Sequence, residues 1–403
     1  MRILNVTQSY DPFFEFGGPP VKVRALSEGL ASRGHAITVL TADWGLNRFL
    51  RQFPNAPRAE DNPFGRKRVA GGVTAIYLVN WLHYRATSWN PGLAGLLRAR
   101  LRDFDVAHIF GLYDLLGPRV AAACREAKVP YVVEPIGMFV PLVRSLWLKR
   151  MYHQVYGREM LAGANAIIVT AEQEQSELIA GGIPKEKIVL RRNGVDGPPV
   201  VPERGRFREA LGIPEEAKLL LFLGRLSEKK SPLLLLQAFA KVVASETPGL
   251  PPVHLAFVGP DESGMLARLI KSAASVVPMG RVHFSPPLAD LAKWQAYRDA
   301  DIFILPSQNE NFGNTAAEAV AAGTPVIVTD QCGIAPLLDG VAGLAVKHDE
   351  TALTAGIREL LHDQPLYARL RAGCATAAGS LDWNQPIEQM ITVYAALATR
   401  PNS

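Results

Sequence analysis

The sequence contains little cysteine: Cys124, Cys332 and Cys374 are the three in 403 residues. Their wide spacing matches neither a disulfide framework nor a set of thiolate metal ligands, so we expect a reduced, cytoplasmic protein. No apolar run reaches the ~18 residues that a membrane-spanning helix needs. Met1 and Arg2 lead directly into an apolar segment, and we therefore expect no signal peptide.

The chain has only a small excess of charge of one sign: 43 Lys and Arg and 38 Asp and Glu give a net charge of +5. The positive excess lies in residues 1–197, whereas residues 198–403 carry a small negative charge. Such a basic N-terminal half suits an anionic acceptor or peripheral contact with the inner surface of an anionic membrane. The alternative is ordinary surface Lys and Arg. We expect no nucleic-acid partner.

The length of the chain predicts two domains, since 403 residues exceed what one ordinary core accommodates. Short apolar strands alternate with helical segments in both halves, a pattern typical of an α/β fold with doubly wound parallel sheets. Residues 191–203 contain Asn-Gly and Pro-Pro and have no periodicity, which indicates a linker between the domains.

The first strand–helix–strand unit is predicted over residues 2–7, 21–33 and 36–42. Its first turn holds Gly17 and Gly18, at the place where such units often face a phosphate. The G-x-G-x-x-G dinucleotide fingerprint is absent, and a flexible turn is the alternative. Residues 44–72 are polar and are predicted to cross the surface as a lid or an acceptor loop.

Two further N-terminal segments suggest contacts with ligands or membranes. Trp81, Tyr84 and Trp89 could stack on a sugar ring or could anchor their loop to the domain. Residues 141–162 are predicted to be one helix with several cations, but its apolar residues do not segregate to one face at the helical period. This segment therefore supports membrane contact only weakly.

Residues 299–330 carry the main candidate site. They predict a buried strand, a polar loop and a helix, in an arrangement that places the loop at the carboxyl end of the strand. Glu310 lies in the loop and Glu318 in the helix. The backbone amides of Phe312, Gly313 and Asn314 lie at the helix start, where anions bind. Two carboxylates beside such amides suit a molecule with sugars on both sides of a phosphate; a solvated acidic loop is the alternative.

The string E-x-F-G-x-x-x-x-E, formed by Glu310, Phe312, Gly313 and Glu318 and followed by A-x-A-A-G-T-P-V-I, resembles the signature of glycosyltransferase family 4. The resemblance covers nearly the whole chain and is strongest over residues 218–346. It implies a GT-B fold, with two Rossmann-like domains facing a central cleft. It also implies a retaining enzyme that transfers a sugar from a nucleoside diphosphate sugar to a hydroxyl acceptor. No cofactor and no metal are expected.

The resemblance also implies a division of the chain. Residues 1–197 would form the acceptor-side domain, and residues 198–380 the domain that binds the nucleotide sugar. Residues 381–403 would form a helix that crosses back to the N-terminal domain.

Site residues of the family transfer onto matching positions. The segment GRLSEKKS resembles G-R-L-x-x-x-K-G, with Ser231 in place of the last glycine, and implies that Arg225 and Lys230 bind the donor diphosphate. Two fixed cations would stabilise the charge of the leaving group. By the same resemblance, Glu318 would bind ribose hydroxyls, and Glu310 would bind hydroxyls of the donor sugar.

Other carried-over contacts are less direct. Residues 284–287, which include Phe284 and Pro286, would contact the nucleobase. Gly17 and Gly18 would lie near the diphosphate, across the cleft.

The segment EPIGMF, residues 134–139, departs from the family. Many members have a histidine before this glycine, whereas this chain has Ile136. His108, Glu134 and Gly137 are candidate contacts to the acceptor or sugar, and a structural role for His108 is the alternative.

Two other classes remain open. One is a GT-B-like sugar-nucleotide epimerase or hydrolase, and the other is a non-catalytic protein that binds a nucleotide sugar. The donor base, the sugar, the acceptor and the oligomeric state do not follow from the sequence.

Overall fold

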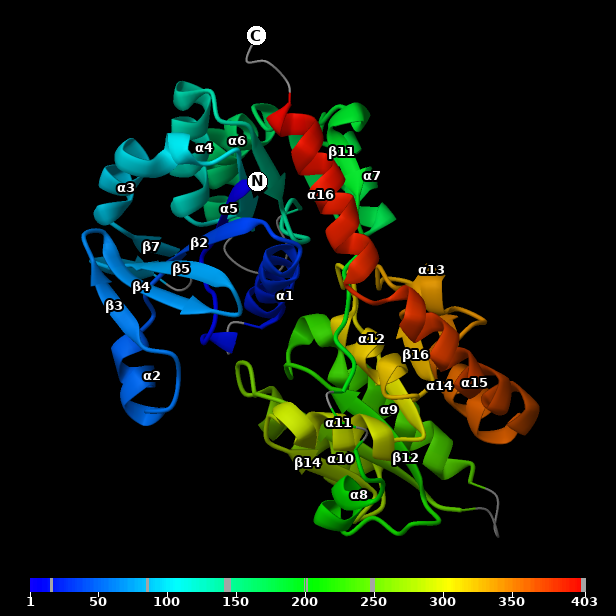
Figure 1. The fold of residues 1–403 in the computed structure, drawn as a ribbon. Helices are drawn as coiled ribbons and strands as arrows, with labels where there is room; N and C mark the ends of the chain where they lie inside the picture. Colours follow the sequence, from blue (N-terminus) through cyan, green and yellow to red (C-terminus); the bar gives the residue numbers. More distant parts are fainter. Residues whose placement is uncertain are drawn as a thin grey trace. The chain divides into compact units, whose positions relative to one another are not determined.

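The computed structural model describes residues 1–14, 17–84, 87–140, 146–198, 200, 202–246 and 251–399, with only the backbone of His83 and Tyr84. The chain divides into two compact units (Figure 1). Unit 1 comprises Met1–Asn193 together with Trp383–Ser403, and unit 2 comprises Gly194–Asp382. Each unit builds its own core around a parallel sheet.

Within its described residues, unit 1 contains a nine-stranded sheet in the order β11-β10-β9-β8-β1-β2-β5-β4-β3. The pairs from β11 to β5 are parallel, and β4 and β3 continue the sheet in antiparallel pairing. The strands are β1 (Arg2–Thr7), β2 (Ala36–Ala42), β3 (Ala59–Asn62), β4 (Gly65–Ala70), β5 (Val73–Leu78), β8 (Val106–Phe110), β9 (Tyr131–Glu134), β10 (Ala166–Val169) and β11 (Ile188–Leu190). The central strands are nearly continuous apolar runs because both of their faces are buried.

The helices of unit 1, all but α5 (Leu146–Tyr152), bury apolar residues in two clusters against the sheet. They are α1 (Gly18–Ser32), α2 (Leu46–Gln52), α3 (Gly92–Arg100), α4 (Leu116–Ala127), α5 (Leu146–Tyr152), α6 (Arg158–Ala162), α7 (Glu172–Ala180) and α16 (Asn384–Ala398). α1 begins earlier than predicted, because Pro19 and Pro20 fit the first turn of a helix. α16 belongs to this unit, where the Gln389 amide donates to the Leu190 carbonyl over 2.9 Å.

The prediction of a surface lid or loop over residues 44–72 is wrong. The segment forms α2 and then the β3–β4 hairpin, which extends the sheet (Figure 1). In the hairpin turn, the Phe64 N–H donates to Asn62 Oδ1 over 3.1 Å. Edge strands commonly carry charged residues that discourage pairing with other chains, and such strands resemble loops in a sequence.

The aromatic cluster lies on a second hairpin, β6 (Leu82–Tyr84) and β7 (Thr87–Trp89). The guanidinium of Arg119 lies 4.6 Å from the ring centre of Trp89, which ties this side of the hairpin to α4. Trp81 is 72% exposed. Trp89 therefore anchors its hairpin to the domain, as one of the two alternatives predicted, whereas the side chain of Trp81 projects into solvent.

The single helix predicted over residues 141–162 is interrupted, and residues 141–145 lie outside the described ranges. A π-helical segment, His153–Gly157, separates α5 from α6. Because a π-turn contains more residues than an α-turn, it rotates the side chains beyond it away from their projected positions. Trp147, Met151 and Val155, which are four residues apart, form an exposed apolar stripe that the projection missed, with exposures of 67%, 48% and 53%.

The described part of unit 2 contains a six-stranded parallel sheet in the order β14-β13-β12-β15-β16-β17. The strands are β12 (Lys218–Leu223), β13 (Val253–Val258), β14 (Val282–Ser285), β15 (Ile302–Leu305), β16 (Val326–Thr329) and β17 (Gly343–Val346). The helices are α8 (Arg206–Leu211), α9 (Pro232–Ala244), α10 (Met265–Val276), α11 (Asp290–Asp299), α12 (Asn314–Ala321), α13 (Ala335–Leu338), α14 (Glu350–His362) and α15 (Gln364–Ser380). None of the helices in the described ranges combines the length and hydropathy that crossing a bilayer requires.

Candidate active site

The predicted donor residues of unit 2 lie on loops that follow the carboxyl ends of neighbouring strands. Because β12 to β16 are parallel, these loops leave the sheet from one edge, where open α/β sheets bind ligands. Gly224 and Gly259 bring the loops after β12 and β13 into contact. The Gly224 N–H donates to the Val258 carbonyl over 2.9 Å, and a Cβ on Gly259 would lie 2.0 Å from the Gly224 oxygen. The backbones are too close here for any side chain.

Lys230 and Glu310 form an ion pair between two of these loops. Lys230 ends a short 3₁₀ turn after β12, whereas Glu310 lies in the loop after β15. The backbone around Glu310 is fixed on both sides: its N–H donates to the Gln331 carbonyl over 3.0 Å, and its carbonyl accepts from the Gly333 N–H over 2.9 Å. The side chains of the pair are 19% and 20% exposed, so a ligand can reach charges that are partly shielded from water.

Arg225 lies at the same edge but contacts a different carboxylate. Its Nη1 is 3.8 Å from Glu262 Oε2, and its side chain is 56% exposed. Within the described residues, no contact joins Arg225 to Lys230 or Glu310. An exposed ion pair contributes little stability, so a ligand phosphate can replace the carboxylate at small cost.

Glu318 is held by two residues of α11 that the sequence analysis did not identify. Lys293 Nζ lies 2.9 Å from Oε1, and the Tyr297 hydroxyl donates to Oε2 over 2.8 Å. Burial raises the pKa of Tyr297 well above its usual value, and the charge of Glu318 adds to the effect. A carboxylate accepts up to about four hydrogen bonds, so this arrangement orients Glu318 and leaves capacity for a ligand. The spacing of Lys293 and Tyr297, four residues apart in a helix before β15, was the available signal.

The start of α12 has no side-chain cap. Gly313 is its N-cap with φ 114°. A Cβ at Gly313 would lie 2.8 Å from the Ile334 Cγ2, so both the conformation and the space require glycine. Phe312 is buried, so only its backbone, and not its ring, is available to a ligand. Asn314 is the first residue of the helix. The uncapped helix start matches an anion site.

The predicted nucleobase contacts lie at the end of β14. The ring of Phe284 stacks on Phe257 with centroids 5.8 Å apart, and Pro286 is exposed. Base recognition at these residues stays a prediction. In the described ranges, no group of three or more His, Cys, Asp or Glu side chains is placed to hold a metal ion.

In unit 1, the Gly17–Gly18 turn offers fewer backbone donors than a typical helix start. The first amides of a helix lack partners within the helix. At α1, however, the Gly17 N–H donates to the Phe14 carbonyl over 3.0 Å, and Pro19 and Pro20 have no N–H. Among the described residues of this turn, Gly18 is therefore the one whose amide can serve a phosphate.

The turn that contains Ile136 and Gly137 has a strained backbone and is held by a buried carboxylate. Both residues have left-handed backbone conformations, with φ of 56° and 67°. For a β-branched residue this conformation costs about 1–2 kcal/mol. Glu174, which is buried, accepts hydrogen bonds from the N–H groups of Gly137 over 2.5 Å and Thr170 over 3.2 Å. Burial raises the pKa of Glu174. The amide of Gly137 is thus already used inside the fold.

His108 and Glu134 are not placed to touch a substrate in this structure, because both side chains have no exposed surface. His108 Nδ1 lies 2.6 Å from the Tyr394 hydroxyl of α16, and its ring stacks on Phe110. The proposed contact of these two residues with the acceptor or sugar is therefore corrected, and the structural alternative is favoured. An apolar strand pattern around His108 was the signal for burial.

Glu134 is the centre of a buried charge cluster that the sequence analysis did not anticipate. It accepts hydrogen bonds from Lys22 of α1 and from Arg191 Nη2, the latter over 2.7 and 2.8 Å. Burial alone would raise the pKa of Glu134, but Arg191 and Lys22 outweigh it and hold that pKa below its usual value. Burial lowers the pKa of Lys22 to about 8, against the opposing effect of Glu134. The cluster ties α1, β9 and the chain after β11 together.

Two family models match this chain. "Glycosyl transferases group 1" matches residues 203–374, and "Glycosyl transferase 4-like domain" matches residues 17–194. The chain is 32% identical over 319 residues to D-inositol 3-phosphate glycosyltransferase 1 of Catenulispora acidiphila, covering 75% of this chain and 74% of that protein. It is 34% identical over 340 residues to D-inositol 3-phosphate glycosyltransferase of Xylanimonas cellulosilytica, covering 80% and 73%.

Solved structures share the fold over nearly the whole chain. Sucrose-phosphate synthase from Thermosynechococcus elongatus matches with a TM-score of 0.73 and 21% identity, over 98% of both chains. Anabaena HepE in complex with UDP matches with a TM-score of 0.74 and 19% identity, over 98% of this chain and 100% of that chain.

The buried imidazole of His108 predicts a measurable acid sensitivity. Burial lowers its pKa to about 3, whereas an unfolded histidine titrates near 6.5. Between these pH values the unfolded chain binds a proton that the native state lacks, so stability falls as the pH drops through 6.5. In denaturant titrations at pH 7 and pH 5, His108→Gln should lose less free energy of unfolding than the wild type, by about 2 kcal/mol.

The matched control for this measurement is Tyr394→Phe, which removes the hydrogen bond to His108 but keeps the imidazole. Its loss of stability between pH 7 and pH 5 should equal that of the wild type. An equal loss in the wild type and His108→Gln would contradict the prediction.

Proposed function

Because this chain belongs to the GT4-like family of glycosyltransferases, we propose that it transfers a sugar from a nucleoside diphosphate sugar to a hydroxyl acceptor, with retention of configuration and without a metal ion. The observation that carries the proposal is the edge of the unit 2 sheet. There an accessible Lys230–Glu310 pair, Arg225, Glu318 and an uncapped helix start all follow the ends of neighbouring strands.

Each of these groups has a role in binding the donor. Glu318, oriented by α11, accepts hydrogen bonds from the ribose. Arg225 and Lys230 contact the diphosphate, and the start of α12 adds backbone donors. Glu310 accepts hydrogen bonds from hydroxyls of the sugar. An ammonium has three donors and a carboxylate about four acceptor sites, so Lys230 and Glu310 can stay paired while each binds the donor.

The same groups support the reaction. The bond between the anomeric carbon and the phosphate oxygen breaks, and the acceptor oxygen bonds to that carbon on the same face. The proton of the acceptor hydroxyl passes to a diphosphate oxygen. Negative charge grows on the diphosphate as the bond breaks, and two fixed cations stabilise that charge more in the transition state than in the ground state. Positioning of the donor supplies the rest.

The acceptor is proposed to bind unit 1, and its class is less constrained. The names of two relatives contain D-inositol 3-phosphate, and the basic N-terminal half suits such an anion. D-inositol 3-phosphate is therefore the first acceptor to assay, and lipid-linked and glycan acceptors are the alternatives. UDP is the first nucleotide to assay, because the HepE structure contains it.

Donor binding should depend on Arg225 and Glu318 while the fold does not. In calorimetric titrations with UDP, GDP and ADP, Arg225→Ala and Glu318→Gln should weaken the affinity for the preferred nucleotide about 10- to 100-fold, the value of a hydrogen bond to a charged group. Glutamine at position 318 can still accept from Tyr297, so the core is retained. Arg98→Ala and Glu216→Gln, both at exposed positions outside the proposed site, are the controls. Unchanged affinity in the two site variants would refute the assignment.

Product analysis separates a transferase from the other classes. A donor with D-inositol 3-phosphate or another acceptor should yield a glycoside whose anomeric configuration matches that of the donor, as NMR can establish, and chelation with EDTA should leave the rate unchanged. Free sugar or an isomerised nucleotide sugar from the donor alone would instead indicate the hydrolase or epimerase. Nucleotide binding without turnover of any acceptor would indicate the non-catalytic alternative.

We also propose peripheral membrane contact through the exposed stripe of Trp147, Met151 and Val155, since Arg150 and Arg158 beside it are exposed cations. Co-sedimentation with phosphatidylglycerol vesicles should exceed that with phosphatidylcholine vesicles. The double variant Trp147→Ser/Met151→Ser should lower the partition constant about tenfold or more. Trp81→Ser, which removes an equally exposed tryptophan elsewhere in unit 1, should have little effect. Equal losses in both variants would contradict a defined docking stripe.

A further inference from the structure

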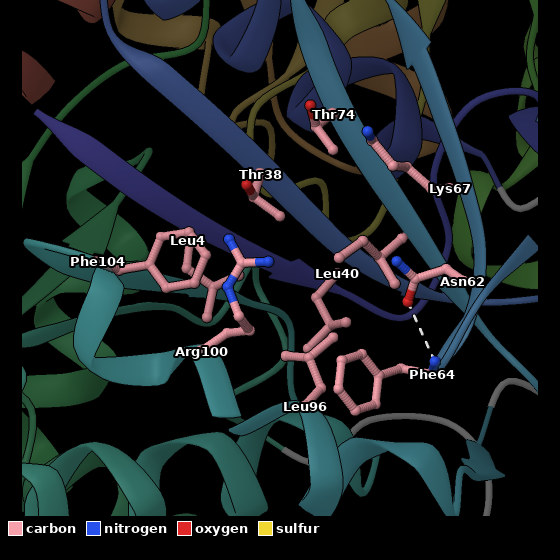
Figure 2. Close-up of a pocket in the computed structure, with 11 residues that line it drawn as sticks. Leu4, Thr38, Leu40, Asn62, Phe64, Lys67, Thr74, Leu96, Arg100 and Phe104 are labelled. Atoms are coloured by element: carbon pink, nitrogen blue, oxygen red, sulfur yellow. Dashed lines mark hydrogen bonds between the residues drawn. The ribbon is translucent and has the colours of Figure 1, made fainter. Parts of the chain in front are cut away.

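Unit 1 contains a second concave site, away from the edge where the predicted ligands would bind. It is a pocket of about 290 Å³ on one face of the sheet, beneath α3 (Figure 2). Its floor includes Leu4, Thr38 and Thr74, which are neighbours in register across β1, β2 and β5. These residues lie in the first halves of their strands. On β2, Thr38 is four residues from the carboxyl end, roughly 13 Å along the strand.

Most of the wall is apolar. Side chains from the sheet, from α3, from the β3–β4 turn and from the segment between α3 and β8 enclose the space. They are Leu4, Leu40, Ile76, Leu96, Phe64 and Phe104. Figure 2 shows Leu4, Leu40, Leu96, Phe64 and Phe104 around the pocket. A ligand that fills it would bury apolar surface on several faces, which favours a hydrocarbon or aromatic body.

The floor nevertheless contains two hydroxyl groups where a covered parallel sheet usually has Val, Ile or Leu. Thr38 and Thr74 are adjacent across β2 and β5. Among the residues that the structure describes, neither hydroxyl has a hydrogen-bond partner. Each can therefore donate one hydrogen bond to a ligand.

Two cations complete the polar side of the pocket. Lys67 of β4 lies across the strand pair from Ile76, and in Figure 2 its ammonium points toward Thr74. Within the described ranges it forms no ion pair, although the exposed Glu60 lies opposite it on β3. Arg100 of α3 donates through Nε to Asp103 over 2.5 Å, and in Figure 2 its guanidinium reaches toward Thr38.

The charge balance selects the kind of ligand. No acidic side chain lines the pocket, which has Lys67 and Arg100 in its wall. Asp103 pairs with Arg100 and also lies 3.3 Å from Arg2 Nη2, whereas Lys67 forms no ion pair within the described ranges. Hydroxyl, ammonium and guanidinium donors all suit a carboxylate, and the apolar wall suits a ligand with a hydrocarbon body better than a free phosphate.

We propose that this pocket binds a small amphiphilic carboxylate, with its apolar body between the sheet and α3 and its carboxylate among Lys67, Arg100 and the two threonine hydroxyls. Such a ligand would connect α3 and the β3–β4 hairpin to the centre of the sheet. It would stabilise unit 1 through a site distinct from the one proposed for sugar transfer. This inference does not depend on the proposed function.

Hexanoate is the probe, tested on the full-length chain by calorimetry and by thermal unfolding. It should bind saturably and raise the Tm, whereas 1-hexanol at equal concentration and inorganic phosphate should each bind at least tenfold more weakly. Lys67→Met should weaken hexanoate binding about tenfold or more, the fold-change expected for one charge-assisted hydrogen bond. Lys271→Met, which removes an exposed lysine of α10 in unit 2, is the matched control and should bind hexanoate as the wild type does.

A second variant guards against a change in folding. Thr38→Val/Thr74→Val keeps the volume of both side chains and removes the two donors, so it should weaken hexanoate binding while the Tm without ligand stays within a few degrees. Equal binding of hexanol and hexanoate would show an apolar crevice only and overturn the proposal. Preferential binding of phosphate, unchanged affinity in Lys67→Met, or no binding of hexanoate would overturn it as well.

Discussion

The ion pair between Lys230 and Glu310 is the contact on which the proposed donor site depends. It joins the loop after β12 to the loop after β15, where the Gln308 N–H also donates to the Lys229 carbonyl over 3.1 Å. Backbone hydrogen bonds to the loop after β16 hold Glu310 from the other side. The pair therefore keeps a cation and a carboxylate at a fixed separation before any ligand arrives. Preorganised charges of this kind need no rearrangement as charge develops on a leaving group.

Unit 1 also contains a set of paired charged residues, but it has a different role because its side chains are buried. Glu134 also pairs with cations, Lys22 and Arg191, but these side chains are almost completely buried. Removing one partner of such a cluster leaves a charge in a medium of low dielectric constant, at a cost of about 3–5 kcal/mol. We infer that this cluster fixes the position of α1 against β9. It thereby also positions the Gly17–Gly18 turn before α1 and the Ile136–Gly137 turn after β9. The exposed fraction of the side chains, rather than their chemistry, separates a binding site from a structural cluster.

Much of the architecture was predictable, because alternating apolar strands and amphipathic helices leave clear periodicities. The family and the GT-B fold class follow from motifs such as the one formed by Glu310, Gly313 and Glu318. The β3–β4 hairpin was missed, since its charged strands resemble a loop, and the exposed stripe of Trp147, Met151 and Val155 was missed because the projection placed the apolar face at other residues of the segment. Lys22 and Arg191 could not be assigned from the sequence, and for Lys293 and Tyr297 their four-residue spacing was the only signal. Their roles depend on contacts between elements distant in the chain, and a sequence gives residue types without those distances.

Two turns hold a residue other than glycine in a left-handed backbone conformation. Ser231 replaces the glycine of the resembled motif and still has φ 48°, with its hydroxyl 2.9 Å from His348 Nε2. Ile136 occupies the position of the family histidine and has φ 56°. Keeping a left-handed conformation without glycine is unfavourable, so neighbouring contacts must supply the compensation. For Ile136, the hydrogen bond from the adjacent Gly137 N–H to Glu174 contributes to this compensation.

The loss of that histidine also bears on the proposed chemistry. Of the three groups suggested for the acceptor side, His108 and Glu134 are buried in the core, and the Gly137 amide is bonded to Glu174. None of these three can accept a proton from a bound hydroxyl. If unit 1 supplies no base through them, the acceptor proton needs another destination. The diphosphate of the donor, which we propose to lie against Arg225 and Lys230, is the group that gains basicity as its bond to the sugar breaks. The substitution at Ile136 is therefore compatible with transfer, provided that the leaving group itself takes the proton.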